Sequence, residues 1–213
     1  MLCHMIIHFV RHGETDFHEN GRYAGQIDIA LNKNGFAQST KLSNWVKKQT
    51  LDLIVASDLK RALETAQQST ECLNQNLRIE PRFREIDFGE LSGLNREEIR
   101  NNFSEIYEVF YNQPTLGVFP RGETVSDAMN RALLGILDLS NEPNLDEILI
   151  VSHATLFRIV LCVLLGINPN EYRTHFPELR NVSISTIEIS KGLDFNQLVG
   201  SAKLIRYNEE ITS

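Results

Sequence analysis

Residues 7–16 read IHFVRHGETD: an apolar run stops at Arg-His-Gly, and the chain then becomes acidic. The β-branched and aromatic residues of 6–10 predict a short buried strand with one polar interruption. Its end presents a fixed cation, Arg11, and an imidazole, His12, while Gly13 allows a sharp turn that brings a backbone N–H close to a ligand. Arginine offers a planar donor fork that fits phosphate oxygens, and a neutral histidine can attack phosphorus. Taken alone, the tripeptide also fits a strand end that carries a solvated arginine and a surface histidine.

Three further segments place similar residues at similar positions. A predicted strand at 53–56 continues through 57–62 into a helix, and a second one at 148–151 is followed by Ser-His-Ala at 152–154 and an apolar helix. Between them, the turn-rich segment 84–93 carries several carboxylates. In an open α/β sheet, ligands bind where strands end and helices begin. Two arginines and two histidines at such an edge predict a site for a dianion, with a nearby carboxylic acid for proton transfer.

In these motifs the chain resembles the histidine phosphatase (phosphoglycerate mutase-like) superfamily, from residue 6 to about residue 190. Each motif is a weak pattern alone, but five in order at the family spacing identify the chain as a member. The motifs are RHGET at 11–15, RYxGxxDxxLxxxGxxQ at 22–38, SDLxRAxxTA at 57–66, RExxxGxxxG at 84–93 and VSH at 151–153.

The resemblance implies phosphoryl transfer from a phosphomonoester to the nucleophile His12, followed by hydrolysis. In this scheme Arg11 and Arg61 clamp the equatorial phosphate oxygens, and His153 donates to another oxygen. Glu85 acts as the general acid that protonates the leaving alkoxide and then as the base that activates water. Because His12 must be neutral at its attacking nitrogen, we expect its other ring nitrogen to donate to a backbone carbonyl.

Some positions leave the assignment open. Asp87 and Glu90 compete with Glu85 for the acid role, although Glu85 occupies the family position four residues before Gly89. The resemblance assigns phosphate binding to Arg11, Thr15, His18, Gly25, Arg61, His153 and Ala154.

Two departures from the family pattern bear on the site. His18 follows the aromatic Phe17 where family members commonly carry Asn. If His18 lines the phosphate pocket, bound phosphate should raise its pKa above the usual ~6.5; a solvent-facing loop histidine is the alternative. The second departure is PRGET at 120–124, where the family usually shows two glycines before Glu, and where Arg121 could point at substrate or at solvent.

Composition excludes several classes of partner. A chain of 213 residues with 42% hydrophobic and 23% charged residues is typical of one globular domain. The formal net charge of −7 argues against nucleic acid as a partner, and it makes a local cluster of cations more informative. No apolar run reaches the ~18 residues that span a membrane. No His, Cys and Asp spacing is typical of a zinc site, so we predict neither a metal nor a cofactor.

Cysteine usage and the N-terminus indicate the compartment. Cys3, Cys72 and Cys162 are odd in number and scattered, which fits reduced thiols. The first residues lack the basic start and the small-residue cleavage site of a secretion signal. We therefore expect a cytoplasmic protein whose partner is a small phosphorylated metabolite. Monomer and homodimer remain open.

The pattern of elements predicts an α/β fold with a mixed, mostly parallel sheet flanked by helices on both faces. We expect one domain over 1–213, in which the resemblance implies a small helical lid at about 88–146. Ser57 is the expected N-cap of the second helix. The expected helices are 35–48, 57–73, 95–111, 124–139 and 154–165, and the expected late strands are 182–189 and 198–206.

Three functions remain in competition. A phosphatase is favoured over a phosphoglycerate mutase, because mutases of this family carry a longer basic insertion after the catalytic Glu. Among residues 90–120 the only cations here are Arg96 and Arg100, and the five glutamates of the same segment should repel a small carboxylate. The third possibility is a module that binds phosphorylated ligands without turnover. Such relatives usually lack one member of the catalytic set, and none is missing here.

Overall fold

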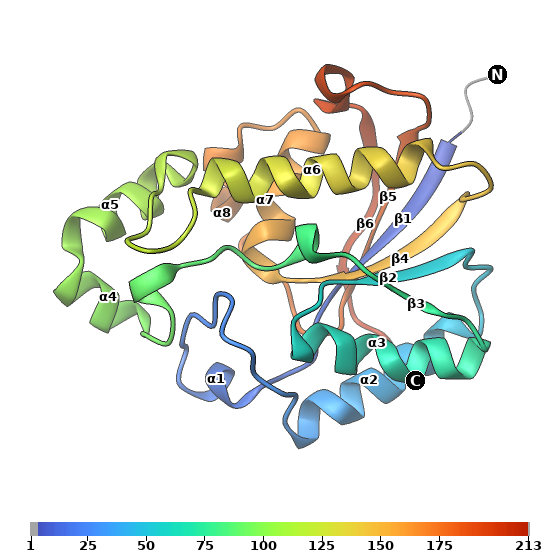
Figure 1. Cartoon of the computed structure of the whole chain (residues 1–213), viewed down its shortest axis with the longest axis horizontal. Helices are drawn as coiled ribbons and strands as arrows, with labels where there is room; N and C mark the ends of the chain where they lie inside the picture. Colours follow the sequence, from blue (N-terminus) through green and yellow to red (C-terminus); the bar gives the residue numbers. More distant parts are fainter. Residues whose placement is uncertain (1–3, 213) are drawn as a thin grey trace.

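Six strands form one mixed sheet in the computed structural model, which describes residues 4–212 (Figure 1). Their order across the sheet is β3-β2-β4-β1-β5-β6. The first four run parallel, whereas β5 pairs antiparallel with β1 and β6 pairs antiparallel with β5. The strands are β1 (His4–Arg11), β2 (Leu53–Ala56), β3 (Leu77–Ile79), β4 (Glu147–Ser152), β5 (Ile184–Ser190) and β6 (Ala202–Glu209).

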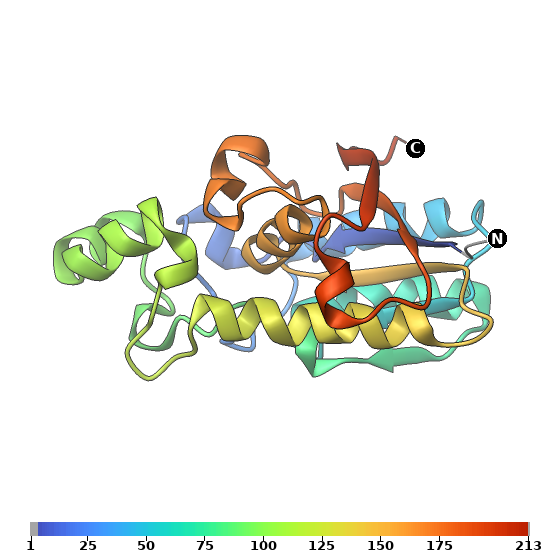
Figure 2. The ribbon, with the colours of Figure 1, turned by 90° about the horizontal axis from the view of Figure 1, so that it is seen from above.

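Helices cover both faces of this sheet, which confirms the predicted fold class. Because side chains alternate along a strand, Phe9 of β1 packs into one core cluster and its neighbour Val10 into the other. The Phe9 side is covered by α6 (Val125–Asn141) and α7 (Ala154–Leu164), and the Val10 side by α2 (Lys33–Val46) and α3 (Lys60–Leu73). Figures 1 and 2 show these layers.

A helical projection extends beyond one end of the sheet (Figures 1 and 2). It contains α4 (Arg96–Asn102) and α5 (Ser104–Asn112). The predicted single helix 95–111 is wrong, because the backbone leaves the helical region at Phe103 (φ −136°, ψ 47°). The remaining short elements are α1 (Asp16–Glu19), α8 (Tyr172–His175) and the 3₁₀ turns η1 (Pro81–Phe83), η2 (Gly89–Leu91), η3 (Pro114–Leu116), η4 (Pro169–Glu171) and η5 (Phe195–Leu198).

The expected lid boundary at 88–146 is too wide. A helix starts at Thr124, as predicted, and the Thr124 side chain accepts from the N–H of Asp127; α6 then runs along the sheet and buries Val125, Ala128 and Ile136 in its core. Only the part before α6 projects past the strand ends, because the apolar face of α6 needs the sheet for burial.

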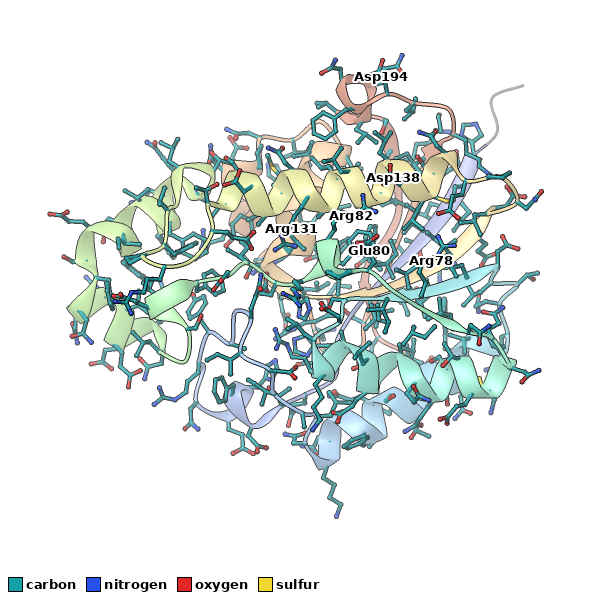
Figure 3. The ribbon with its side chains drawn as sticks, in the orientation of Figure 1. Arg78, Glu80, Arg82, Arg131, Asp138 and Asp194 are labelled. Carbon is teal, nitrogen blue, oxygen red and sulfur yellow. The ribbon has the colours of Figure 1, made fainter. Side chains whose placement is uncertain are left out.

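Charged side chains connect α6 to the segment that follows β3. Arg82, just after β3, donates to Glu80 at 2.7 Å and to Asp138 of α6 at 2.6 Å, and these bonds raise its pKa. Figure 3 labels these three side chains together with Arg131, which also points from α6 toward η1. The segment that follows η1 is therefore held against α6 before it reaches Glu85.

Two further sequence predictions concern the cysteines and the absence of a membrane-spanning segment. Cys72 is exposed and Cys162 is buried, and neither forms a disulfide; Cys3 lies outside the described residues. Within residues 4–212, no helix combines the length and the apolar character needed to cross a membrane.

Candidate active site

The predicted residues meet where three neighbouring strands end. His12 follows β1, Ser57 follows β2 and His153 follows β4, and these strands lie side by side in the order β2-β4-β1. A cavity of about 540 Å³ opens there. Eight of the nine predicted site residues line it, namely Arg11, His12, Thr15, His18, Gly25, Arg61, Glu85 and Ala154.

His12 is held as a neutral imidazole. Its Nδ1 lies 2.7 Å from the carbonyl oxygen of Gly13, so that nitrogen donates and Nε2 keeps its lone pair. Burial, and next the positive charge of Arg61, keep the pKa of His12 well below its ordinary value. This is the arrangement expected of a histidine that attacks through Nε2.

Two buried arginines flank the histidine. Arg61, with 0% of its surface exposed, donates to the carbonyls of Ile27 (2.9 Å) and Gly25 (2.7 Å). Arg11 donates to the carbonyl of Leu179 at 2.6 Å. Burial lowers the pKa of both guanidinium groups to about 10. In the described part of the chain, Nε of each is buried without a hydrogen-bond partner, which favours a bound anion that can accept these protons.

The carboxylate of Glu85 lies at the N-terminus of α7. Its Oε2 accepts from the backbone N–H of Thr155 at 3.0 Å, and its Oε1 from that of Leu156 at 2.9 Å. A helix N-terminus holds a carboxylate well, because its first N–H groups have no partner within the helix. The competing Asp87 and Glu90 line a separate surface groove, so Glu85 is the only one of the three in the wall of the cavity.

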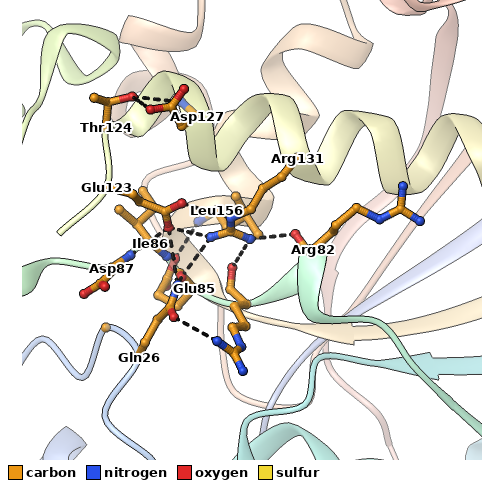
Figure 4. Close-up of polar contacts among 12 residues, drawn as sticks. Gln26, Arg82, Glu85, Ile86, Asp87, Glu123, Thr124, Asp127, Arg131 and Leu156 are labelled. Atoms are coloured by element: carbon orange, nitrogen blue, oxygen red, sulfur yellow. Dashed lines mark hydrogen bonds and ion pairs between the residues drawn. The ribbon is translucent and has the colours of Figure 1, made fainter.

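An ion pair behind Glu85 holds its backbone (Figure 4). Arg131 of α6 donates to three backbone carbonyls, those of residues 82 (2.6 Å), 84 (2.8 Å) and 85 (3.0 Å). It is also bonded to Glu123 at 2.6 Å, and Glu123 accepts from the N–H of Asp87 at 2.8 Å. The residues on both sides of Glu85 are thus fixed to one charged pair, which the sequence analysis did not identify.

His153 is the one predicted site residue that does not line the cavity, but its ring lies beside that of His12 and its buried Nδ1 has no hydrogen-bond partner among the described residues. Its ring is fully buried with its centroid 5.1 Å from that of His12, and its Nε2 lies 2.7 Å from the hydroxyl of Ser57. The prediction of Ser57 as a helix N-cap is wrong, because α3 begins only at Lys60, after Leu59. Burial and the charge of Arg61 keep the pKa of His153 well below its ordinary value.

His18 lines the cavity, and its ring lies against Arg11. Its Nε2 faces two donors, the guanidinium of Arg11 at 2.5 Å and the amide of Asn181 at 3.3 Å, so Nε2 must accept. Its Nδ1 faces Thr15 alone, 3.0 Å from the backbone nitrogen and from the hydroxyl of that residue and 3.1 Å from its carbonyl oxygen. Burial, and next Arg11, lower the pKa of His18 to about 4. The ring therefore orients Arg11 as a neutral acceptor.

The glycines at and beside the cavity, Gly13 and Gly25, allow close packing and a sharp turn of the backbone. The N–H of Gly13 is bonded to the Thr65 hydroxyl at 2.8 Å, so the expectation that it faces a ligand is wrong. A Cβ at Gly13 would lie 2.8 Å from the carbonyl oxygen of Gly35, which makes close packing the reason for this glycine. Gly25 turns with φ +52° and contributes its carbonyl to Arg61.

Arg121 points to solvent. Its side chain is 85% exposed and pairs with Glu90 at 3.2 Å, outside the cavity wall. Its backbone has φ +59°, in the left-handed region that favours glycine, which fits the glycine usual at this position in the family.

Other cavity-lining residues were not anticipated. They include the cations Arg22, Arg96 and Arg158 and the aromatics Tyr23 and Phe88. Arg22 and Tyr23 come from the loop after α1, and Phe88 from the segment before η2. Arg96 lies in α4 and Arg158 in α7, so no single sequence motif contains all five. Across the described residues, no three His, Cys, Asp or Glu side chains are grouped to hold a metal ion.

The fold and the site define a class of α/β protein in which a neutral histidine and two buried arginines meet at the strand ends, an arrangement suited to an anion. The chain belongs to the histidine phosphatase superfamily (branch 1), whose family model matches residues 7–199. This confirms the family predicted from the five motifs.

Known proteins similar to this chain include phosphatases and mutases. Phosphoserine phosphatase 1 of Hydrogenobacter thermophilus is 30% identical over 185 residues, covering 81% of this chain and 87% of the relative. A probable phosphoglycerate mutase of Enterobacter sp. strain 638 is 28% identical over 182 residues, covering 85% of this chain and 84% of the relative. A solved mycobacterial glucosyl-3-phosphoglycerate phosphatase shares the fold, with a TM-score of 0.86, 24% identity and coverage of 97% and 100%. These similarities identify the chain as a phosphatase-type enzyme of the superfamily.

Proposed function

We propose that this protein hydrolyses a small phosphomonoester through a phosphohistidine formed on His12. The observation that carries the proposal is the neutral His12, bonded through Nδ1 to a carbonyl, in one cavity wall with Arg11, Arg61 and Glu85. A phosphate monoester is a dianion near neutral pH, and its transition state spreads charge over three equatorial oxygens. Two guanidinium groups fixed by backbone carbonyls are positioned to stabilise that charge without reorganisation.

The reaction needs two balanced steps. In the first, Nε2 of His12 forms a bond to phosphorus while the ester P–O bond breaks, and Glu85 in its acid form gives its proton to the leaving alkoxide. In the second, Glu85 takes a proton from water, whose oxygen attacks phosphorus as the P–N bond breaks. The products are the alcohol and inorganic phosphate. His153 is proposed to donate to a phosphate oxygen, and Thr15, His18, Gly25 and Ala154 to shape the wall around it.

The names of the relatives support this proposal at the level of the substrate class. One is a phosphoserine phosphatase and another a probable phosphoglycerate mutase, so phosphorylated metabolites are their substrates by name. Transfer of the phosphoryl group to an alcohol instead of water would make the chain a mutase. Retention of the ligand without turnover would make it a binding module.

Two assays separate these functions. The first is stopped-flow turnover of p-nitrophenyl phosphate, and the second measures release of inorganic phosphate from a panel of alkyl phosphomonoesters. A phosphatase releases stoichiometric phosphate in every cycle. Phosphate transfer to added alcohol in preference to water would support the mutase function, and binding without any product release would support the binding module.

A further inference from the structure

Ser57 opens the motif at 57–66, but it neither caps α3 nor lines the cavity. The sheet places it beside the end of β4. Ala56 pairs with Val151, and the N–H of Ser57 donates to the carbonyl of Val151 at 3.1 Å. From this position the Ser57 hydroxyl reaches Nε2 of His153 at 2.7 Å. Because the register of two parallel strands fixes both residues, this hydrogen bond is built into the fold.

The Ser57 hydroxyl is the one group that orients the ring of His153 by a hydrogen bond within residues 4–212. It is bonded to Nε2, whereas the buried Nδ1 has no partner. Both residues are 0% exposed, so solvent is excluded from the contact. Loss of the hydroxyl would leave both ring nitrogens without a partner, and the proton could then move from one nitrogen to the other.

The direction of this hydrogen bond determines which nitrogen of His153 carries the proton. A neutral imidazole has one N–H and accepts at its other nitrogen. Burial, and next the charge of Arg61, keep the pKa of His153 well below its ordinary value, so the ring is neutral near neutral pH. The Ser57 hydroxyl has one proton to donate, and Nε2 is its only acceptor in the described part of the chain. A buried donor without an acceptor costs free energy, so Ser57 donates to Nε2 and the ring proton lies on Nδ1.

A proton on Nδ1 gives the site a third donor for an anion. Nε of Arg11 and Nε of Arg61 are likewise buried without a partner among the described residues, and a guanidinium can only donate. The ring of His153 lies beside that of His12, with the centroids 5.1 Å apart. With the proton on Nδ1, all three of these nitrogens are donors, which matches the three equatorial oxygens of the transferred phosphoryl group. The other tautomer would leave a lone pair on Nδ1, to which a phosphate oxygen cannot donate.

We infer that Ser57 is a positioning residue for His153: its hydroxyl donates to Nε2, keeps the ring proton on Nδ1, and so supplies the phosphoryl group with its third N–H donor. The inference rests on the proposed function and deepens it, because it states how the donor assigned to His153 is kept in the correct tautomer. Ser57 is absent from the cavity wall, so it acts through His153.

The tautomer of His153 is measured directly by long-range ¹H–¹⁵N correlation spectra of protein labelled with ¹⁵N-histidine. A protonated ring nitrogen resonates far upfield of an unprotonated one, and the signals of His153 are those missing from His153→Gln. Near neutral pH we expect a protonated Nδ1 and an unprotonated Nε2 in the wild type. A proton on Nε2 would overturn the inference, and this measurement requires no turnover.

Ser57→Ala should release the tautomer and slow the reaction. The spectra should then show the two tautomers of His153 in exchange. For p-nitrophenyl phosphate, kcat/KM should fall by about tenfold, the factor that corresponds to one hydrogen bond. Ser57→Thr keeps the hydroxyl and should retain the proton on Nδ1 and most of the rate.

A double-mutant cycle separates positioning from a general structural role. In the His153→Gln background, Ser57→Ala should change kcat/KM by less than about twofold, because the ring through which Ser57 acts is gone. A further tenfold loss in that background would mean that Ser57 acts by another route, and would overturn the inference.

Ser140→Ala is the matched control for the loss of a buried hydroxyl. Ser140 is also 0% exposed and donates to the carbonyl of Leu137 at 2.8 Å, but it lies on α6 and is absent from the cavity wall. This variant should keep the wild-type kcat/KM and the wild-type tautomer of His153. A loss of rate in Ser57→Ala no larger than that in Ser140→Ala would contradict the role of Ser57.

The outcomes distinguish this inference from the proposed function. If the wild type hydrolyses no phosphomonoester while His153 carries its proton on Nδ1, the proposed function fails and the tautomer assignment stands. If the wild type is active but Ser57→Ala changes neither the tautomer nor the rate, only the role of Ser57 is overturned.

Discussion

Replacing Arg131 by Met tests whether the ion pair behind Glu85 positions the general acid. Methionine keeps the apolar stem of the side chain but removes every donor. Three backbone carbonyls, of residues 82, 84 and 85, lose their partner, and Glu123 loses its cation. Glu123 still accepts from the N–H of Asp87, so its carboxylate is not left without any donor.

The expected cost follows from these contacts. Each lost hydrogen bond to a carbonyl removes about 1 kcal/mol, so three remove about 3 kcal/mol of the free energy of unfolding. Both side chains of the Arg131–Glu123 pair are 21% exposed, so solvent screens their attraction only in part. Loss of this pair adds little to the drop in the free energy of unfolding, because Glu123 keeps other donors. For a domain of this size, we expect the melting temperature to fall by about 6–12 °C.

Arg78→Met is the matched control for stability. Its pair with Glu142, at 2.5 Å, joins the strand before η1 to the end of α6, but the side chains are 40% and 38% exposed. An exposed pair of this kind contributes about 0–1 kcal/mol, so this variant should unfold almost as the wild type does.

The positioning role of Arg131 is tested by comparing hydrolysis rates for substrates with different leaving groups. A displacement of about 1 Å at a catalytic group can cost about 100-fold in rate. Arg131→Met should therefore slow hydrolysis of alkyl phosphates by about 10- to 100-fold, and that of p-nitrophenyl phosphate by no more than about threefold, because the aryl leaving group needs no proton. Equal losses for both substrates, or a melting temperature unchanged from the wild type, would refute the reasoning.

The remaining predictions concern the acid, the histidine beside Arg11, and metal ions. Glu85→Gln should slow alkyl esters by about 10²- to 10⁴-fold and aryl esters far less; equal losses would shift the acid role to another group. Because the pKa of His18 is about 4 in the folded chain and ~6.5 when unfolded, the unfolded state binds more protons between these values, so the free energy of unfolding should fall as pH drops from about 6.5 to 4. His18→Asn should make that fall shallower in urea titrations, although His12 and His153, whose pKa values are also lowered, still contribute to it. The variant should leave the pH dependence of phosphate inhibition unchanged between pH of about 5.5 and 8; an unchanged fall in stability would contradict the pKa assignment. Activity should survive EDTA, since Arg11 and Arg61 supply the positive charge at the phosphate, and a strict requirement for added magnesium or zinc would contradict this.

Local sequence was enough to predict the catalytic edge of the sheet. Arg11 ends an apolar strand, and His12 and His153 directly follow one. Because parallel strands bring their carboxyl ends to one edge, position in the motif determined position in space. The helix starts at residues 95 and 124 were predicted from equally local signals, because the side chains of Asn95 and Thr124 bond to an N–H three residues away.

Contacts between distant segments were not predictable in this way. Ser57 resembles a helix cap in sequence, yet its hydroxyl is bonded to His153, 96 residues away. The sequence also gives no sign that Arg11 and Asn181 face Nε2 of His18. Arg96 lies in an acidic segment, and only the folded projection shows that the guanidinium, not the glutamates, lines the cavity. The three-residue β3 is too short for its periodicity to be read.

The most direct test of the account is identification of the phosphorylated atom. The wild type is mixed with ³²P-labelled substrate, quenched within milliseconds under basic conditions that preserve phosphoramidates, and mapped by mass spectrometry. We expect a transient, acid-labile and base-stable phosphoryl group on His12, absent in His12→Ala, which should also retain less than about 1% of the activity. Label on another residue, or full turnover with no labelled enzyme, would contradict it.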